Sequence, residues 1–134
     1  MPNYWILKTE PSTYSFDALV KEGTAVWDGV SNPVALKNIR NMAKGDQVMI
    51  YHTGDEKAIV GFATVVSEAR PDPTNPKVSV VDLRAGVPIA RPVTLAAIKS
   101  DPVFADLALV RQGRLSVVPV PAALWKRLVS LGTE

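Results

Sequence analysis

The chain has 134 residues, of which 15 are basic, 13 are acidic and 47% are hydrophobic, with one histidine and no cysteine. This length suits one domain with an ordinary core, so we expect residues 1–134 to form a single domain. The composition excludes disulfides and thiolate metal sites, and we expect neither a metal ion nor another cofactor.

Membrane association and secretion are not expected. No apolar run approaches the roughly 20 residues of a membrane-spanning helix. The first residues lack the basic stretch and long apolar core of a signal peptide. We therefore expect a cytoplasmic protein that does not bind membranes, and we expect a monomer. The net charge of +2 and the isoelectric point of about 9.0 permit a local basic patch without requiring one.

Short strands and helices follow one another along the chain, bounded by turn residues. In order, the expected elements are strand 4–9, helix 16–22, strand 24–27, helix 33–42, strands 47–52, 58–67, 78–83 and 87–93, helices 94–100 and 102–108, strand 114–118 and helix 121–131. Ser15 and Asn32 are the expected N-caps, Gly23 ends the first helix and Pro33 begins the second. Residues 70–76 ("RPDPTNP") are expected to form a rigid loop. Because no strand–helix–strand rhythm with long crossovers runs through the chain, we predict an α+β domain on a curved sheet or small barrel.

Catalytic motifs are weak in this sequence. His52 ends an apolar strand beside Tyr51, and no nucleophile-elbow pattern accompanies it. We interpret His52 as a hydrogen-bonded residue at a strand end rather than as a general base. The acidic residues at turns are expected to be solvated and lack the spacing of a calcium loop: Asp46, Asp55 and Glu56.

The turn after strand 24–27 is the strongest candidate for a binding site. Trp27 stands at its start, Gly29 lets the backbone approach a ligand, and the helix that begins near Asn32 offers N–H groups. A nucleobase could stack on the indole while amides bond to its edge. Three cations on or after this helix are candidate phosphate contacts: Lys37, Arg40 and Lys44. The alternative is that Trp27 is core and these cations are ordinary surface residues.

Four stretches taken together resemble the EVE domain, a member of the PUA-like superfamily. They are "YWILKTEPSTYSFDAL", "VWDGVSNPVALKNIRNMAKGDQVMIYHTG", "EKAIVGFATVVSEARPDP" and "FADLALVRQGRLSVVPVPAALW". The resemblance covers nearly the whole chain. It implies a five- or six-stranded curved sheet or barrel flanked by short helices. It also implies kinship with YTH domains, which hold a methylated adenine in an aromatic pocket, and a role in reading modified bases in DNA or RNA.

The same resemblance implies which residues form the pocket. Trp27 becomes a pocket wall rather than core. The other implied pocket residues are Lys8, Thr9, Val30, Asn32, Tyr51, His52, Arg114, Leu115 and Ser116. Arg70 stands where the family usually has an aromatic residue, which implies a more open or more basic pocket here.

Three functions compete at this stage. The leading hypothesis is a module that binds a modified nucleobase in DNA or RNA, with a modified cytosine as the expected base and no catalysis. The second is an amidohydrolase of the related ASCH type, using Lys8, Thr9 and either Glu10 or Glu68. Adjacent strand residues point to opposite faces, which argues against joint action of Lys8 and Thr9. The third is a structural or protein-interaction domain with a vestigial pocket.

Overall fold

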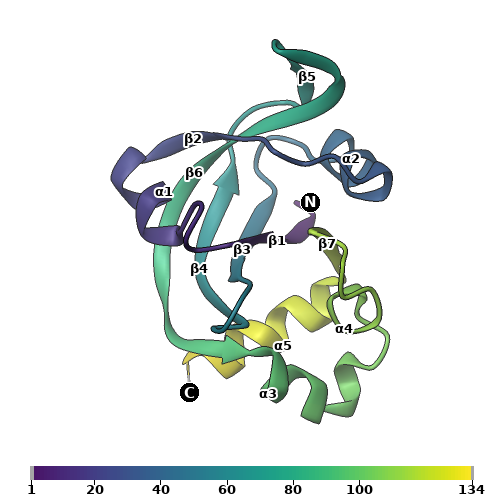
Figure 1. Cartoon of the computed structure of the whole chain (residues 1–134). Helices are drawn as coiled ribbons and strands as arrows, with labels where there is room; N and C mark the ends of the chain where they lie inside the picture. Colours follow the sequence, from purple (N-terminus) through teal and green to yellow (C-terminus); the bar gives the residue numbers. More distant parts are fainter. Residues whose placement is uncertain (1, 134) are drawn as a thin grey trace.

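The computed structural model describes residues 2–133, which form strands interspersed with short helices (Figure 1). The elements are β1 (Tyr4–Thr9), α1 (Phe16–Glu22), β2 (Thr24–Trp27), α2 (Pro33–Arg40), β3 (Gln47–His52), β4 (Ala58–Val65), β5 (Arg70–Asp72), β6 (Asn75–Thr94), α3 (Leu95–Ser100), the 3₁₀ helix η1 (Pro102–Phe104), α4 (Ala108–Arg111), β7 (Val117–Val120) and α5 (Ala122–Thr133). The predicted α+β class is confirmed. None of the helices within residues 2–133 is both long and apolar enough to cross a bilayer.

Seven strands form one curved sheet in the order β2-β6-β4-β3-β1-β7, with β5 attached to β6. The sheet is open, because β2 and β7 are its outer strands and no pairing joins them in the described residues. A closed barrel is therefore wrong, and the strand number exceeds the five or six expected. Pro119 lies in β7 and cannot donate to a ladder, which suits the outer position of that strand.

Strand β1 brings together segments that are far apart in the sequence. It runs parallel to β3, with Lys8 opposite Tyr51, and antiparallel to β7, with Leu7 opposite Val117. Beyond the ladder, the N–H of Lys8 donates to the carbonyl of Ser116 at 2.9 Å. The first, second and last of the four stretches that resemble the EVE domain thus meet at the end of β1, and the candidate site lies there.

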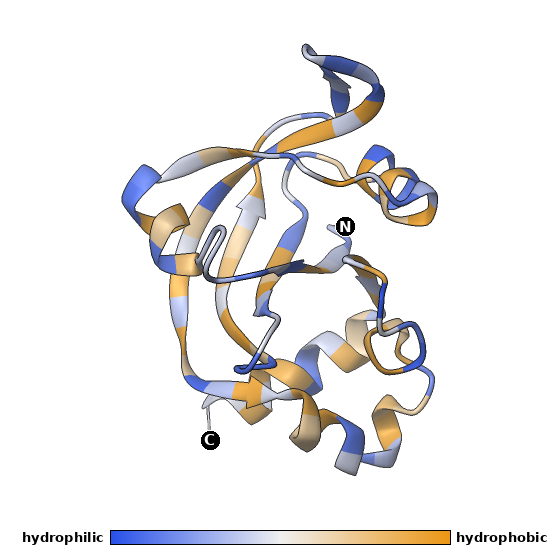
Figure 2. Cartoon of the chain, in the orientation of Figure 1, coloured by the Kyte–Doolittle hydropathy of each residue, from blue (hydrophilic) through white to orange (hydrophobic). Residues whose placement is uncertain are grey.

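The two early helices begin where their capping residues predict. Ser15 Oγ accepts the N–H of Ala18 at 3.1 Å, and Gly23 at φ 77° ends α1 in a conformation that favours glycine. Helix α2 ends at Arg40 with Asn41 as its C-cap, so it is shorter than the predicted 33–42. In Figure 2 this helix carries both hydrophobic and hydrophilic residues, as expected for a helix with one buried face.

The predicted loop 70–76 is instead a tight hairpin between β5 and β6. Asp72 Oδ1 accepts the N–H and the hydroxyl of Thr74, each at 2.9 Å, and these bonds close the turn. The predicted strands 78–83 and 87–93 are parts of one strand, β6, which runs the height of the molecule in Figure 1. A Cβ on Gly86 would lie 2.9 Å from the carbonyl oxygen of Phe62, so this glycine permits close strand packing rather than ending a strand.

The C-terminal third differs from the prediction in its boundaries. The predicted helix 102–108 is divided into η1 and α4, and β7 starts at Val117 rather than at residue 114. Gly132, expected after the last helix, lies inside α5, where a Cβ would collide with Ile89 of β6. Glycine therefore allows α5 to pack closely on the sheet at this point.

One turn carboxylate is a core residue, contrary to the prediction. Asp46 is 2% exposed, and its side chain accepts the N–H of Asn3 (3.0 Å), the indole N–H of Trp5 (2.9 Å) and the N–H of Ala43 (3.0 Å). These donors compensate the loss of water around a buried carboxylate. Asp55 and Glu56 are exposed as predicted.

Candidate functional site

A cavity of about 700 Å³ lies where the end of β1 faces β2 and the turn after it. We call it the Trp27 cavity. Its lining residues come from β1 and the loop after it, from α1, from β2 and its turn, and from the segment before β7: Lys8, Thr9, Glu10, Thr13, Tyr14, Glu22, Ala25, Val26, Trp27, Asp28, Gly29, Val30 and Ser116. Five residues of the predicted pocket therefore share one cavity: Lys8, Thr9, Trp27, Val30 and Ser116.

Trp27 is both a core residue and a cavity wall. It is the last residue of β2, where it pairs with Val81, and 7% of its surface is exposed. The ring of Tyr14 meets the indole edge to face, with 6.1 Å between centroids and 76° between planes. The two interpretations of Trp27 that the sequence left open are thus not exclusive, because one indole packs the sheet and also borders the cavity.

Lys8 and Thr9 send their polar groups to different partners. Lys8 Nζ donates to the carbonyl of Gly113 at 2.9 Å and lies 5.7 Å from the centre of the Tyr51 ring. Burial lowers the pKa of Lys8. The Thr9 hydroxyl donates to the carbonyl of Tyr14 at 2.6 Å. The polar groups thus have different partners, although both residues line the Trp27 cavity.

The remaining predicted pocket residues lie elsewhere. Tyr51 lines a smaller cavity of about 190 Å³, the lysine cavity, whose other lining residues are Lys8, Thr53, Gly54, Lys57, Leu95, Lys99, Leu109, Val110 and Gly113. Asn32, Arg114 and Leu115 line a third cavity of about 270 Å³. Arg70 does not line the Trp27 cavity; it donates to Asp82 at 2.9 Å and to Ser67 at 3.3 Å. The blocks of the resemblance are adjacent, but the predicted pocket residues are divided among three hollows rather than gathered in one.

The amides at the start of α2 are already occupied. Asn32 Oδ1 accepts the N–H groups of Val34 (2.9 Å) and Ala35 (3.1 Å), and the Asn32 carbonyl accepts that of Leu36. Pro33 has no N–H to offer. The idea that helix amides read the edge of a base is therefore not supported, because the N-cap that starts the helix also satisfies its donors.

His52 has a structural role in this fold. It is 8% exposed, its Nε2 accepts the N–H of Phe16 at 3.0 Å, and its Nδ1 lies 2.8 Å from Glu56 Oε1. Both ring nitrogens thus have partners, and the Phe16 bond ties β3 to the start of α1. This agrees with the interpretation of His52 as a hydrogen-bonded residue at a strand end.

The three candidate phosphate contacts on and after α2 are exposed, and none forms an ion pair within residues 2–133: Lys37, Arg40 and Lys44. They do not border the Trp27 cavity. Arg40 and Lys44 flank Asn41, which lines a different hollow at the other end of β1.

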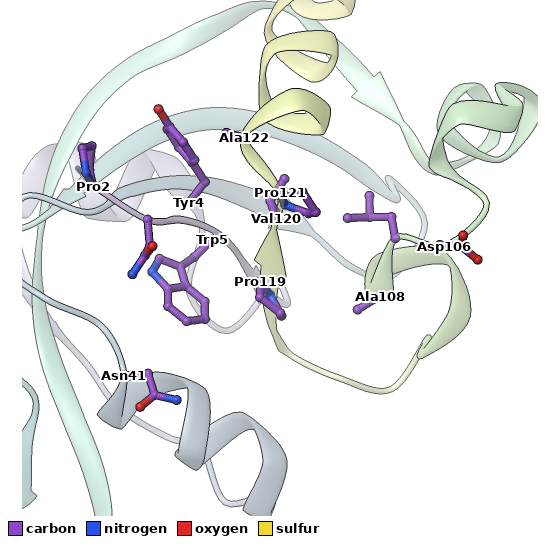
Figure 3. Close-up of a pocket in the computed structure, with 12 residues that line it drawn as sticks. Pro2, Tyr4, Trp5, Asn41, Asp106, Ala108, Pro119, Val120, Pro121 and Ala122 are labelled. Carbon is purple, nitrogen blue, oxygen red and sulfur yellow. The ribbon is translucent and has the colours of Figure 1, made fainter.

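That hollow, the Tyr4 cavity, has a volume of about 680 Å³ (Figure 3). Its lining combines two aromatic residues with prolines and small residues: Pro2, Asn3, Tyr4, Trp5, Asn41, Asp106, Leu107, Ala108, Pro119, Val120, Pro121 and Ala122. Tyr4 stacks on Trp125 with 4.7 Å between centroids, and the Trp5 indole donates to Asp46. No motif in the sequence pointed to this cavity.

Several residues of the Trp27 cavity were also missed, chiefly Tyr14, Glu22 and Asp28. The Tyr14 hydroxyl donates to Glu22 at 2.9 Å. Burial raises the pKa of Tyr14 to about 12, helped by this hydrogen bond and by the charges of Glu22 and Asp28. Asp28 is exposed and accepts no hydrogen bond within the described residues. The position of Asp28 next to Trp27 in the sequence could have indicated that it borders the same site, whereas only the tertiary fold brings Tyr14 to the cavity.

The residues of the amidohydrolase alternative meet only in part. Glu10 lines the Trp27 cavity with Lys8 and Thr9, but its carboxylate accepts the N–H and hydroxyl of Ser12 at 3.1 and 2.9 Å. The Ser12 N–H is the main cause of the lowered pKa of Glu10. Glu68 does not line this cavity. Among residues 2–133, no group of three or more His, Asp or Glu side chains could hold a metal ion.

Comparisons with known proteins connect this geometry to a family. The sequence model of the EVE domain matches residues 3–131. Thymocyte nuclear protein 1 of Danio rerio is 30% identical over 99% of this chain and 74% of its own length. The NMR structure of a protein from Rhodopseudomonas palustris is 43% identical, with a TM-score of 0.92 over 97% of this chain and 92% of that one.

A further solved structure includes a ligand. The human THYN1 protein, crystallised in complex with DNA containing 5-methylcytosine, is 26% identical, with a TM-score of 0.90 over 98% of both chains. A distant likeness to an ASCH protein of Zymomonas mobilis, 18% identical with a TM-score of 0.60, reflects the fold alone. The shared architecture confirms the expected PUA-like α+β fold.

Proposed function

The chain belongs to the EVE domain family, and from this membership we propose that it binds DNA carrying a modified cytosine, with 5-methylcytosine as the base. The observation that carries the proposal is the human relative of the same fold, which binds DNA containing 5-methylcytosine. We place the base in the Trp27 cavity. Binding of RNA, a monomeric state and a cytoplasmic location stay predictions.

The size and walls of the Trp27 cavity suit an extruded base. Its volume of about 700 Å³ lies within the roughly 300–1,000 Å³ of typical ligand pockets. Trp27 and Tyr14 supply aromatic surface, and stacking contributes about 1–3 kcal/mol per base. Extrusion from a duplex costs a few kcal/mol, so we expect tighter binding where the base is already unpaired.

Asp28 supports cytosine as the base. Cytosine carries an amino group at N4, which donates, whereas thymine carries an accepting oxygen at that position. The exposed Asp28 carboxylate at the cavity wall can accept from N4 and would repel the thymine oxygen. The 5-methyl group would meet apolar surface such as Ala25 and Val30. One methyl gives limited discrimination, roughly 10- to 100-fold over plain cytosine.

The test is a titration of matched oligonucleotides at fixed salt. Each set carries 5-methylcytosine, cytosine or thymine at one position, as single or double strands and as DNA or RNA. We expect the methylated cytosine in DNA to bind most tightly. Asp28→Asn should reduce the preference for cytosine over thymine by about tenfold, as loss of one charged hydrogen bond predicts. Asp17→Asn, at an exposed carboxylate on α1, is the control.

Equal affinities across every matched set would refute the proposal.

Amidohydrolase activity is a second candidate, since Lys8, Thr9 and Glu10 line the same cavity. Incubation with N4-acetylcytidine, followed by chromatography, checks it: deacetylation that depends on Glu10 would favour an enzyme over a reader.

A further inference from the structure

The lysine cavity collects positive charge from three separate parts of the chain. Lys8 comes from β1, Lys57 from the turn between β3 and β4, and Lys99 from the last turn of α3. None of its described lining residues is a carboxylate. Lys57 and Lys99 are exposed and Lys8 is half-buried, and an anion bound among the three ammonium groups would reduce their mutual repulsion. This arrangement is what a bound anion would stabilise.

The backbone holds Lys57 in an unusual conformation at this cavity. Lys57 has φ 46°, and it is the one non-glycine residue of positive φ among residues 2–133. Glycine or asparagine is the common choice there, because a side chain is disfavoured in the left-handed region. The Lys57 carbonyl accepts the N–H of Leu95 at 2.8 Å, which anchors this residue beside α3. A strained lysine in a cavity wall suggests that its side chain is used.

Of the two neutral lining residues with hydroxyl groups, Tyr51 is the candidate donor. Burial raises the pKa of Tyr51, which keeps its proton in place for donation. The Thr53 hydroxyl already donates to the Thr9 carbonyl at 3.4 Å and to Glu10 Oε2 at 3.5 Å.

One carboxylate lies beside this wall. Glu10 Oε1 accepts from Ser12, but Glu10 Oε2 accepts the Thr53 hydroxyl at 3.5 Å and would lie 2.8 Å from a Cβ on Gly54. The three lysines outnumber this carboxylate, and Glu56 is paired with His52.

The size and position of the cavity indicate part of a larger ligand. Its volume of about 190 Å³ is below the roughly 300 Å³ of small-molecule pockets. At about 30 Å³ per water it holds about six water-sized atoms, enough for a phosphate group. Lys8 lines both this cavity and the Trp27 cavity, so the two hollows share a wall.

We propose that Lys8, Lys57 and Lys99 form a subsite for one backbone phosphate next to the nucleotide whose base occupies the Trp27 cavity. This inference rests on the proposed function, because it places the phosphate relative to the bound base. The subsite differs from the exposed cations of α2, which border neither cavity.

The first arm of the test measures the salt dependence of binding to a methylated oligonucleotide. The variants are Lys57→Gln, Lys99→Gln and the double variant, with Lys126→Gln on the exposed side of α5 as the control. Both lysines serve one phosphate together with Lys8, so the double variant should lower the log–log slope by no more than about 0.9 in total. Two independent contacts would lower it by about 1.8. Melting curves check that each variant is folded.

The second arm replaces single phosphates by neutral methylphosphonates on either side of the modified base. One linkage should weaken binding to the wild-type protein and should have no further effect in the double variant. 5-Methyl-2′-deoxycytidine 5′-monophosphate, compared with its nucleoside, tells whether that phosphate is the 5′ one. If every linkage affects wild type and double variant equally, or if the double variant binds like Lys126→Gln, the subsite is refuted.

The two proposals fail in different ways. A preference for methylated DNA without coupling between the lysines and one linkage would overturn the subsite alone. Coupling without any base preference would overturn the modified-base function and leave a phosphate site.

Discussion

The Trp27 and Tyr4 cavities have almost the same volume, about 700 and 680 Å³, and each has a tryptophan in its wall. They lie at opposite ends of β1. Their chemistry differs: four charged residues line the first, Lys8, Glu10, Glu22 and Asp28. Asp106 is the only charged lining residue of the second within residues 2–133. Volume alone therefore does not identify a binding site, and the polar groups in the wall must distinguish them.

The aromatic residues of the two cavities also differ in how they are held. In the Tyr4 cavity the tyrosine ring stacks on Trp125, and the Trp5 indole N–H is bonded to buried Asp46. In the Trp27 cavity the indole meets Tyr14 edge to face. The aromatic residues of the Tyr4 cavity are thus committed to packing, whereas the Trp27 cavity also offers acceptors and a cation that can orient a base.

The largest expected effect is that of Trp27→Ala. Loss of the platform should weaken binding of methylated DNA by tenfold or more, as stacking of about 1–3 kcal/mol predicts. Because Trp27 is 7% exposed, truncation should also lower the free energy of unfolding by about 3–5 kcal/mol. Trp27→Phe retains part of the ring and separates the two effects. Asn41→Ala, at the exposed edge of the Tyr4 cavity, is the control.

Fluorescence anisotropy measures the DNA affinity, and denaturant titration measures the free energy of unfolding. The opposite result would place the site in the Tyr4 cavity. In that case the folded Trp27→Phe and Trp27→Ala variants would bind DNA normally, and Asn41→Ala would bind it more weakly.

Asp46→Ala perturbs the Tyr4 cavity, because Asp46 holds the indole of its lining residue Trp5. It removes the acceptor of three N–H groups, from Asn3, Trp5 and Ala43. Each buried donor left without a partner costs roughly 1–3 kcal/mol. We expect a clear loss in melting temperature, yet unchanged DNA affinity at a temperature where the variant is folded. A loss of affinity in the folded variant would mean that the Trp5 side of β1 takes part in binding.

Local signals predicted the parts of this molecule that depend on neighbours in the sequence. Ser15, Gly23 and Asn32 define helix ends through bonds to residues two to four positions away. Asp46 could not be predicted as buried, because its donors include Asn3 and Trp5, which only the β1–β3 pairing brings near. A turn carboxylate is solvated by default, and tertiary contacts reversed that default here.

The candidate site could likewise be predicted only where its residues are neighbours in the sequence. Trp27 could be proposed because a tryptophan, a glycine turn and a capped helix are adjacent in sequence. The resemblance supplied the other blocks, but it could not say that Tyr51 and Arg114 line separate cavities. That division depends on which way the Tyr51 side chain points from β3 and the Arg114 side chain from the segment before β7.

The exposed cations of α2 test which side of the molecule carries the DNA backbone. If Lys37, Arg40 and Lys44 contact phosphates, each replacement by Gln should lower the log–log salt slope by about one. Since Arg40 and Lys44 flank the Tyr4 cavity residue Asn41, a strong effect there together with none at Lys57 and Lys99 would place the backbone along that side. Unchanged slopes in all three variants would remove α2 from the interface.

The smallest expected effect is at alkaline pH and involves Tyr14. Burial, the Glu22 hydrogen bond and the Glu22 and Asp28 charges raise its pKa from 10.0 to about 12. Between these values the unfolded chain has released the proton and the folded chain still holds it, so stability falls as the pH rises through this window. Tyr14→Phe removes that contribution and should flatten the decline between pH 10 and pH 12, measured by denaturant titration. Tyr4→Phe, which removes a phenol from the other cavity, is the matched control. Identical declines in wild type and Tyr14→Phe would mean that burial and the Glu22 contact do not raise the pKa of Tyr14 in solution, and this difference between the Trp27 and Tyr4 cavities would be lost.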